Sequence, residues 1–250
     1  MIVWREKFAA FGIHFLATLG VALLAAALIF LVWYPEPFGT MVGGLKLFTL
    51  ITGCDLVLGP LVSLVVYDSR KTRLALTVDY TVIVVLQLAA LVYGIHSVSQ
   101  ARPVYVAFVK DRLEVIAAAE IGEKDLLEAH APYDRLPWRG PRLVATYVKP
   151  EDSNDALTQG LEGHDVGVRP KFYVDYASQL PQIQRRLKSL PPLMRRSREF
   201  GRVISAGLDE VGRPAEDFGW LPVRHPKGFW TVLIDRRTGY PALYLPIDPY

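Results

Sequence analysis

The stretch FAAFGIHFLATLGVALLAAALIFLVW, from Phe8 to Trp33, contains no charged residue. About 20 predominantly apolar residues suffice for a helix to cross the hydrocarbon of a bilayer. Leu47 to Tyr67 and Ala75 to Val98 are long enough as well, and each carries one carboxylate, Asp55 and Asp79. The sequence therefore predicts three transmembrane helices, at about residues 8–33, 47–67 and 75–98.

A cleavable signal peptide is the competing interpretation of the first stretch. Its apolar run is much longer than the roughly 7–15 residues of a signal-peptide core, and no small-x-small cleavage site closes it. We therefore expect a membrane domain over residues 1–98. The remaining residues, 99–250, have the length of one typical folded domain.

Composition excludes several functions for residues 99–250. This segment carries 22 basic and 20 acidic residues, whereas a nucleic-acid binder is expected to present a basic face. Cys54 is the only cysteine, so a disulfide or a cysteine-based zinc site cannot form within one chain. GxSxG, Walker A, GxGxxG and HExxH motifs are absent from the sequence. We expect no catalytic residue, no cofactor and no nucleic-acid partner.

The short loops predict the orientation, because Lys and Arg mark the cytoplasmic side. Arg5 and Lys7 precede the first span, and three basic residues lie between the second and third spans. The loop between the first two spans has none, although Lys46 follows it. This pattern predicts a multi-pass membrane protein with a cytoplasmic N-terminus and a C-terminal domain on the outer side, which in a bacterium is the periplasm.

The sequence of residues 99–250 predicts a mixture of strands and helices. Residues 102–121 predict two strands joined by a tight turn at Lys110–Asp111, and residues 142–150 predict a third strand. Helices are expected near residues 123–134, 151–163, 177–190 and 191–201, followed by three strands. The predicted fold class is a three-helix membrane bundle plus an extracytoplasmic α+β domain with a mainly antiparallel sheet.

Four polar residues in the spans are candidate sites: His14, Asp55, Asp79 and Gln87. A charged residue at the bilayer centre costs about 2.5–3.5 kcal/mol on insertion scales, so it usually faces protein or water. By depth, Asp55 can meet Gln87 and His14 can meet Asp79. Asp55 is interpreted as a structural hydrogen-bonding group, a contact for a partner's membrane helix, or a proton relay.

A basic run is the second candidate site. It comprises Arg185, Arg186, Lys188, Arg195, Arg196, Arg198 and Arg202. It is interpreted either as a solvated helix face or as a surface that docks on anionic lipid or on an acidic partner. The histidines of the soluble segment, His130, His164 and His225, are widely spaced and match no ligand pattern.

Three pieces of the sequence resemble the TfpX/TfpZ family of type IV pilin accessory proteins. They are GPLVSLVVYDSRK (59–71), QLAALVYGIHSVSQARPVYVAFVKDR (87–112) and TVLIDRRTGYPALYLPIDPY (231–250). The resemblance implies an inner-membrane protein that helps a pilin to be assembled into surface fibres, as a pilin-specific chaperone or assembly modulator. It implies a type IV pilin as partner, with other pilus-assembly proteins of the inner membrane, and it brings no catalytic residues.

Two alternatives stay open at this stage. One is a membrane-anchored sensor or receptor with an extracytoplasmic domain; its cytoplasmic parts are too short to hold an output domain. The other is a membrane enzyme that modifies a pilin, which requires an acid–base cluster in a cleft. A polar neighbour beside His130, His164, Asp165 or His225 is the feature that keeps this enzyme alternative open.

Overall fold

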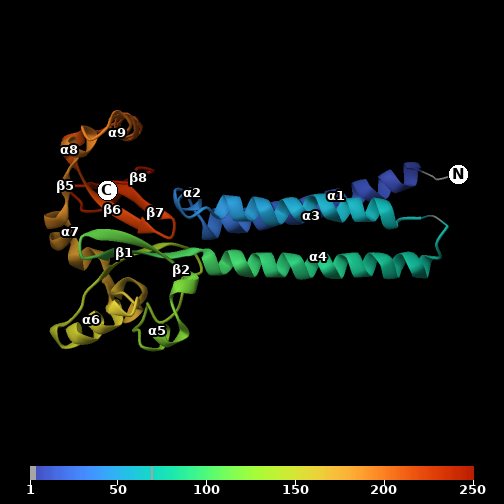
Figure 1. Ribbon diagram of the computed structural model, residues 1–250, viewed down its shortest axis with the longest axis horizontal. Helices are drawn as coiled ribbons and strands as arrows, with labels where there is room; N and C mark the ends of the chain where they lie inside the picture. The colour runs from blue at the N-terminus through green and yellow to red at the C-terminus, as the bar shows by residue number, and fades with distance from the viewer. Residues whose placement is uncertain (1–3, 69) are drawn as a thin grey trace. The chain divides into compact units, whose positions relative to one another are not determined.

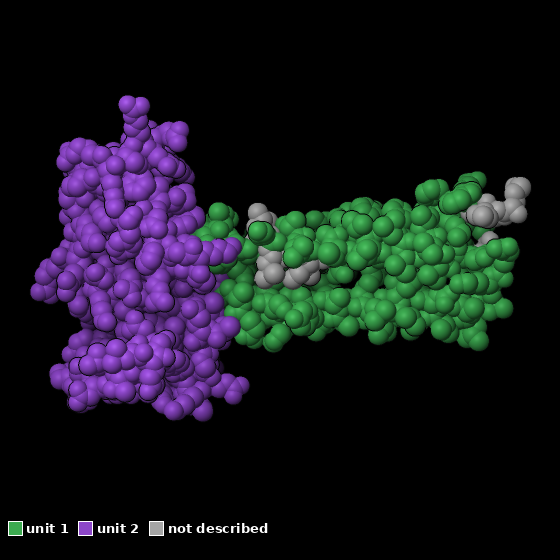
Figure 2. Space-filling view, viewed as in Figure 1, with its two compact units in different colours: residues 1–102 green, residues 103–250 purple. Residues whose placement is uncertain are grey.

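The computed structural model describes residues 4–68 and 70–250. The chain divides into two compact units, residues 1–102 and residues 103–250, which are coloured separately in Figure 2. All strands among the described residues belong to the second unit.

Three long helices make up most of the first unit (Figure 1). They are α1 (Trp4–Leu28), which continues into a π-helical turn (Ile29–Trp33), α3 (Gly44–Val66) and α4 (Arg73–Ala101). The short helix α2 (Phe38–Val42) precedes α3. Three spans, Trp4–Trp33, Phe48–Val66 and Arg73–Ala101, are long and apolar enough to cross a membrane. The prediction of three long apolar helices is therefore confirmed.

The outside of the first unit is apolar. Leu24 is 74% exposed, and Leu31 and Val65 are each 78% exposed. Exposing one such side chain to water costs about 1.5–3 kcal/mol relative to burying it. These helices are therefore suited to an apolar surrounding, as the lengths of the spans also indicate.

One end of the helical unit is closed by a small core around Tyr34. This side chain is 1% exposed, and its hydroxyl donates a hydrogen bond to the carbonyl oxygen of Val98 at 2.7 Å. Ile29 and Trp33 pack in the same cluster. The contact fixes the end of the first long helix to α4.

The second unit is built on one sheet with the strand order β4-β3-β1-β2-β6-β7-β8, and β5 pairs with β6. The strands are β1 (Pro103–Val109), β2 (Arg112–Ala117), β3 (Arg142–Thr146), β4 (Tyr173–Asp175), β5 (Lys188–Ser189), β6 (Phe218–His225), β7 (Gly228–Asp235) and β8 (Pro241–Leu245). Every residue of β1 is buried, as expected for a strand that is apolar on both faces.

The sheet is mixed, which corrects the prediction of a mainly antiparallel sheet. β1 pairs in parallel with β3, and β2 pairs in parallel with β6. Parallel neighbours require crossover connections of about a dozen residues or more, and the helical segments after β2 and after β3 provide them. The prediction failed because alternation within a strand does not identify its partner from a distant part of the chain.

The helices of the second unit are α5 (Glu123–Leu127), α6 (Ser153–Leu161), α7 (Leu180–Arg186), α8 (Leu190–Met194) and α9 (Arg198–Val211). The helix expected over 177–190 is shorter, because β5 follows α7. The helix expected to end at Gly201 is instead two helices. Ser197 accepts a hydrogen bond from the backbone N–H of Phe200 and caps α9, and Gly212 ends it with a φ of 67°.

The second unit contains two hydrophobic cores. One gathers side chains of β1, β3 and β4, with Tyr105 and Tyr173 at its centre. The other packs α8 and α9 against β6, β7 and β8, and contains Leu193, Ile204 and Leu233. The sheet is therefore covered by different helices at its two ends.

Candidate functional site

A cluster of polar side chains lies among the three long helices. The Nε2 atom of His14 on α1 lies 2.7 Å from Oε1 of Gln87 on α4. A carbonyl oxygen only accepts, so Nε2 carries the proton, and Nδ1 then accepts a hydrogen bond from the hydroxyl of Ser63 on α3. One imidazole thereby links all three helices.

Asp55 lies beside this cluster in a cavity of about 210 Å³. The cavity is lined mostly by apolar residues of α1, α3 and α4, and its polar lining comprises His14, Thr18, Thr52, Asp55 and Gln87. Within residues 4–68 and 70–250, the carboxylate of Asp55 has no hydrogen-bond or ion-pair partner. A carboxylate that lines an apolar cavity in this way is suited to a donor brought by another molecule.

The polar residues of the long helices do not form the pairs that were predicted from their depths along the helices. Gln87 bonds to His14 rather than to Asp55, and Asp79 forms an ion pair with Lys71 at 2.6 Å rather than meeting His14. Depth along a helix fixes the level of a residue but not the direction in which it points. The sequence reasoning also missed Ser63, a fully buried hydroxyl in an apolar helix.

Gly59 allows α3 to approach this cluster. A Cβ atom built at Gly59 would meet the amide of Gln87 and would lie 3.2 Å from Nε2 of His14. Pro60 follows it inside α3. The Gly-Pro pair of the sequence thus leaves room for the imidazole and the amide.

A second cavity, of about 290 Å³, lies in the sheet-containing unit and is polar. It is lined among others by Glu114, Asp165, Arg224 and His225. Glu114 is 4% exposed and accepts from Arg112 at 2.6 Å, while Nη1 of Arg224 lies 3.6 Å away. Burial and nearby Lys227 lower the pKa of His225. The cavity is thus lined by an imidazole with a lowered pKa and by a carboxylate with guanidinium partners.

The sequence reasoning missed Glu114 and its partners. The available signal was a carboxylate between Leu113 and Val115 in an apolar strand, because such a charge needs a partner on the buried face. The structure also places Nε2 of His164 3.0 Å from Asp125. No group of three or more metal-ligating His, Cys, Asp or Glu side chains occurs among residues 4–68 and 70–250.

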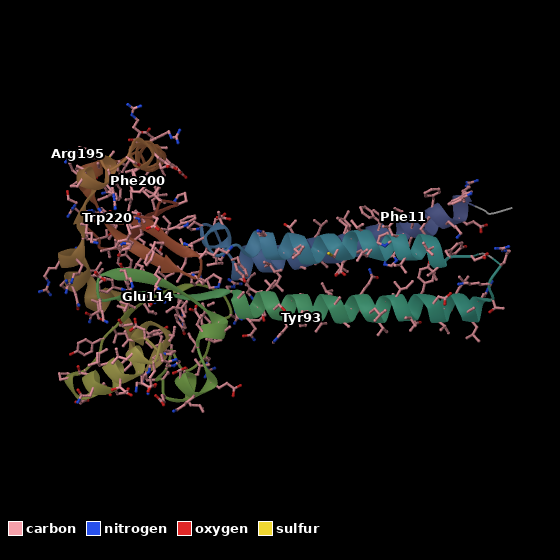
Figure 3. The ribbon with its side chains drawn as sticks, in the orientation of Figure 1. Phe11, Tyr93, Glu114, Arg195, Phe200 and Trp220 are labelled. Atoms are coloured by element: carbon pink, nitrogen blue, oxygen red, sulfur yellow. The ribbon has the colours of Figure 1, made fainter. Side chains whose placement is uncertain are left out.

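The basic run extends over α7, β5, α8 and α9. All seven side chains, Arg185, Arg186, Lys188, Arg195, Arg196, Arg198 and Arg202, are exposed. Arg195 is labelled at the end of α8 in Figure 3. None of the seven forms an ion pair with a described residue. We call this set the basic ridge.

These features define the class: a protein with three apolar, potentially membrane-crossing helices, a polar cluster between them, and a separate mixed-sheet unit. A family model described as "Fimbrial assembly protein FimB" matches residues 2–43. The chain is 31% identical over 229 residues to a fimbrial assembly protein of serogroup I from Dichelobacter nodosus, covering 90% of this chain and 89% of the relative. A relative of serogroup E1 from the same organism is 30% identical over 229 residues, which again cover 90% of this chain and 89% of the relative.

The chain therefore belongs to the family of fimbrial assembly proteins. A third relative, of serogroups C1 and C2, is 40% identical over 118 residues, which cover 47% of this chain and 90% of the relative. These matches confirm the resemblance seen in the three sequence pieces. No solved structure matches the chain.

Proposed function

We propose that this chain is an accessory protein of a bacterial inner membrane that binds a type IV pilin and assists its assembly into surface fibres. The observation that carries the proposal is the similarity to fimbrial assembly proteins over 90% of the chain. The helices would lie in the membrane, and the second unit would face the periplasm. The distribution of Lys and Arg in the short loops supports this orientation.

The first unit offers chemistry for holding a pilin's membrane helix. Helices associate in lipid through close packing and hydrogen bonds, because lipid tails are as apolar as their side chains. The unpartnered carboxylate of Asp55, in a cavity with Thr18 and Thr52, supplies an acceptor for such a contact. The bilayer is thus a partner of the exposed apolar side chains, and the pilin helix is a partner of the cavity.

The test is recovery of pilin with the full chain from detergent-solubilised membranes, with surface pili counted in the same cells. We expect Asp55→Leu to reduce pilin recovery and piliation. Thr77→Leu is the matched control, because the Thr77 hydroxyl donates to the carbonyl of Arg73 within its own helix. A chain that recovers no pilin, or pili that persist unchanged without the chain, would overturn the proposal.

The polar cavity beside Glu114 and the His164–Asp125 pair favour a second candidate, an enzyme that modifies a pilin. His225, whose pKa is lowered, lines this cavity together with carboxylates, and an imidazole and a carboxylate are groups used in acid–base catalysis. The discriminating measurement is the intact mass of pilin from cells with and without the chain. A mass difference supports the enzyme, and equal masses with altered piliation support the assembly factor, which we propose to be non-catalytic.

A further inference from the structure

The basic ridge concentrates charge on one part of the second unit. Between Tyr176 and Leu208 the chain has seven basic residues and one acidic residue, Glu199. The remainder of residues 99–250 has 15 basic and 19 acidic residues. The net charge of residues 99–250 is therefore close to zero although the ridge is strongly positive, because the rest of the segment is net acidic.

Several cations elsewhere in this unit pair with carboxylates. Arg112 pairs with Glu114, Arg169 with Asp155, and Arg213 with both Asp217 and Asp235. On the ridge the hydrogen-bond partners among the described residues are neutral. Nε of Arg185 donates to the carbonyl of Pro181, and Arg196 donates to the carbonyl of Pro249.

Lys188 is held in the same way by aromatic rings. Its Nζ atom lies 4.8 Å from the ring centroid of Trp220 and 6.0 Å from that of Tyr250. A ring or a carbonyl positions a cation without cancelling its charge. The side chains are therefore partly ordered before a partner arrives, which lowers the entropy lost on binding.

The composition of the ridge indicates the kind of partner. Six of its seven members are arginine, whose planar guanidinium binds carboxylates with two parallel hydrogen bonds. Large apolar residues of the same segment, such as Ile183, Leu190 and Ile204, are fully buried. Among the described residues, no large apolar side chain between Tyr176 and Leu208 is strongly exposed. A surface without apolar side chains to insert into lipid favours a protein face over a membrane.

We propose that the basic ridge is the docking surface for an acidic face of a partner protein. This rests on the proposed function, because the partner expected to present that face is the pilin. Attraction between the two charged faces would steer the encounter and fix its orientation. Binding through the ridge would also weaken as the salt concentration rises.

The experiment compares capture of purified pilin by the full chain in an uncharged detergent. The ridge variant carries Arg186→Gln, Arg195→Gln, Arg198→Gln and Arg202→Gln, four positions without a side-chain partner among the described residues. The control variant removes the same charge elsewhere on the exposed surface, through Lys124→Gln, Arg139→Gln, Lys227→Gln and Arg237→Gln.

We expect the ridge variant to bind pilin about tenfold or more weakly, and with a shallower salt dependence, because each exposed pair contributes about 0.2–1 kcal/mol. The control should bind like the wild type. Equal binding by the wild type and both variants would overturn the proposed role of the ridge and leave the proposed function standing. A ridge effect that appears only after anionic phospholipid is added to the micelles assigns the ridge to lipid and also overturns it. A wild-type chain that captures no pilin overturns the proposed function together with this inference.

Discussion

The imidazole of His14 and the amide of Gln87 form a 2.7 Å hydrogen bond between residues 73 positions apart in the chain. The second ring nitrogen of His14 bonds to Ser63 on the remaining long helix. Apolar side chains give little rotational preference to helices in lipid, because lipid and helix surfaces are alike. The bond between His14 and Gln87 therefore contributes to fixing which faces of α1 and α4 meet.

The first prediction is an energetic coupling between these two residues. We expect His14→Leu and Gln87→Leu each to lower the free energy of unfolding, and the double variant to lose less than their sum. Hydrogen bonds between membrane helices give coupling energies of about 0.6–1.7 kcal/mol, which is the range expected in this cycle. The measurement is equilibrium unfolding of the full chain in mixed micelles, followed by circular dichroism.

Thr77→Leu serves as the control for that cycle, because the Thr77 hydroxyl donates to a carbonyl of its own helix, α4. It should change stability little and should not couple to either partner. Strict additivity of His14→Leu and Gln87→Leu would show that the two side chains do not interact.

The second prediction concerns two glycines of α3. A Cβ atom at Gly59 would collide with the amide of Gln87, whereas one at Gly53 would have nothing within 4 Å. We expect Gly59→Val to lower the free energy of unfolding by about 1–3 kcal/mol through overpacking. Gly53→Val adds the same side chain to the same helix and should change it little. Equal effects of the two substitutions in mixed micelles would contradict the close approach at Gly59.

Much of the architecture could be predicted because it depends on local patterns. The three apolar helices follow from length and composition, and the β1–β2 hairpin follows from the turn at Lys110–Asp111. The pairing of distant elements could not be predicted in this way. The parallel pairing of β1 with β3 and of β2 with β6 depends on crossover connections between distant parts of the chain. The bond between His14 and Gln87 depends on how α1 and α4 are rotated about their axes.

The candidate sites divide in the same way. The sequence identified His14, Asp55, Asp79 and Gln87 because polar residues are conspicuous in apolar spans. It did not identify Glu114, whose importance comes from the partners that the fold brings to it, Arg112 and Arg224. Whether any of these residues, or the basic ridge, binds a partner stays a prediction.

The third prediction is a dependence of stability on acid pH through Asp235. Its carboxylate accepts from Nη1 of Arg213 at 2.6 Å and from the backbone N–H groups of Arg237 and Thr238. The hydrogen bond from Arg213 is the main reason that the pKa of Asp235 lies below its usual value. The unfolded chain therefore takes up the proton first, so the stabilisation is complete above about pH 4 and is lost as the pH falls through the folded pKa.

We expect Asp235→Asn to lower the free energy of unfolding at pH 7 by about 1 kcal/mol and to flatten its decline in acid. Asp134→Asn is the control, because the ion-pair partner of Asp134 is the largely exposed Arg135, at 3.6 Å. Urea unfolding of the full chain in micelles at several pH values measures both. A decline in acid that is as steep in Asp235→Asn as in the wild type would refute this assignment.

The fourth prediction concerns alkaline pH and Tyr173. Its hydroxyl, buried in the core, donates to the carbonyl of Gly167 at 2.6 Å, and its ring packs edge-on against Tyr105 at 4.9 Å between centroids. Burial raises the pKa of Tyr173 well above its ordinary value and that of Tyr105 to about 12. Unfolded tyrosine ionises near pH 10, so the folded state holds more protons above that pH, and its stability falls as the pH rises further.

Tyr173→Phe removes one of the buried phenols and leaves the carbonyl of Gly167 without its donor. We expect a loss of about 1–3 kcal/mol at pH 7, and a shallower fall in stability above about pH 10 than in the wild type. Tyr250→Phe, at a residue that is 65% exposed, should alter neither quantity much. Near-ultraviolet circular dichroism during urea unfolding at pH 7 to 11 reports both. If the alkaline slope is unchanged in Tyr173→Phe, the phenol of Tyr173 does not contribute to it, and other buried tyrosines with a raised pKa, such as Tyr105 and Tyr176, account for it.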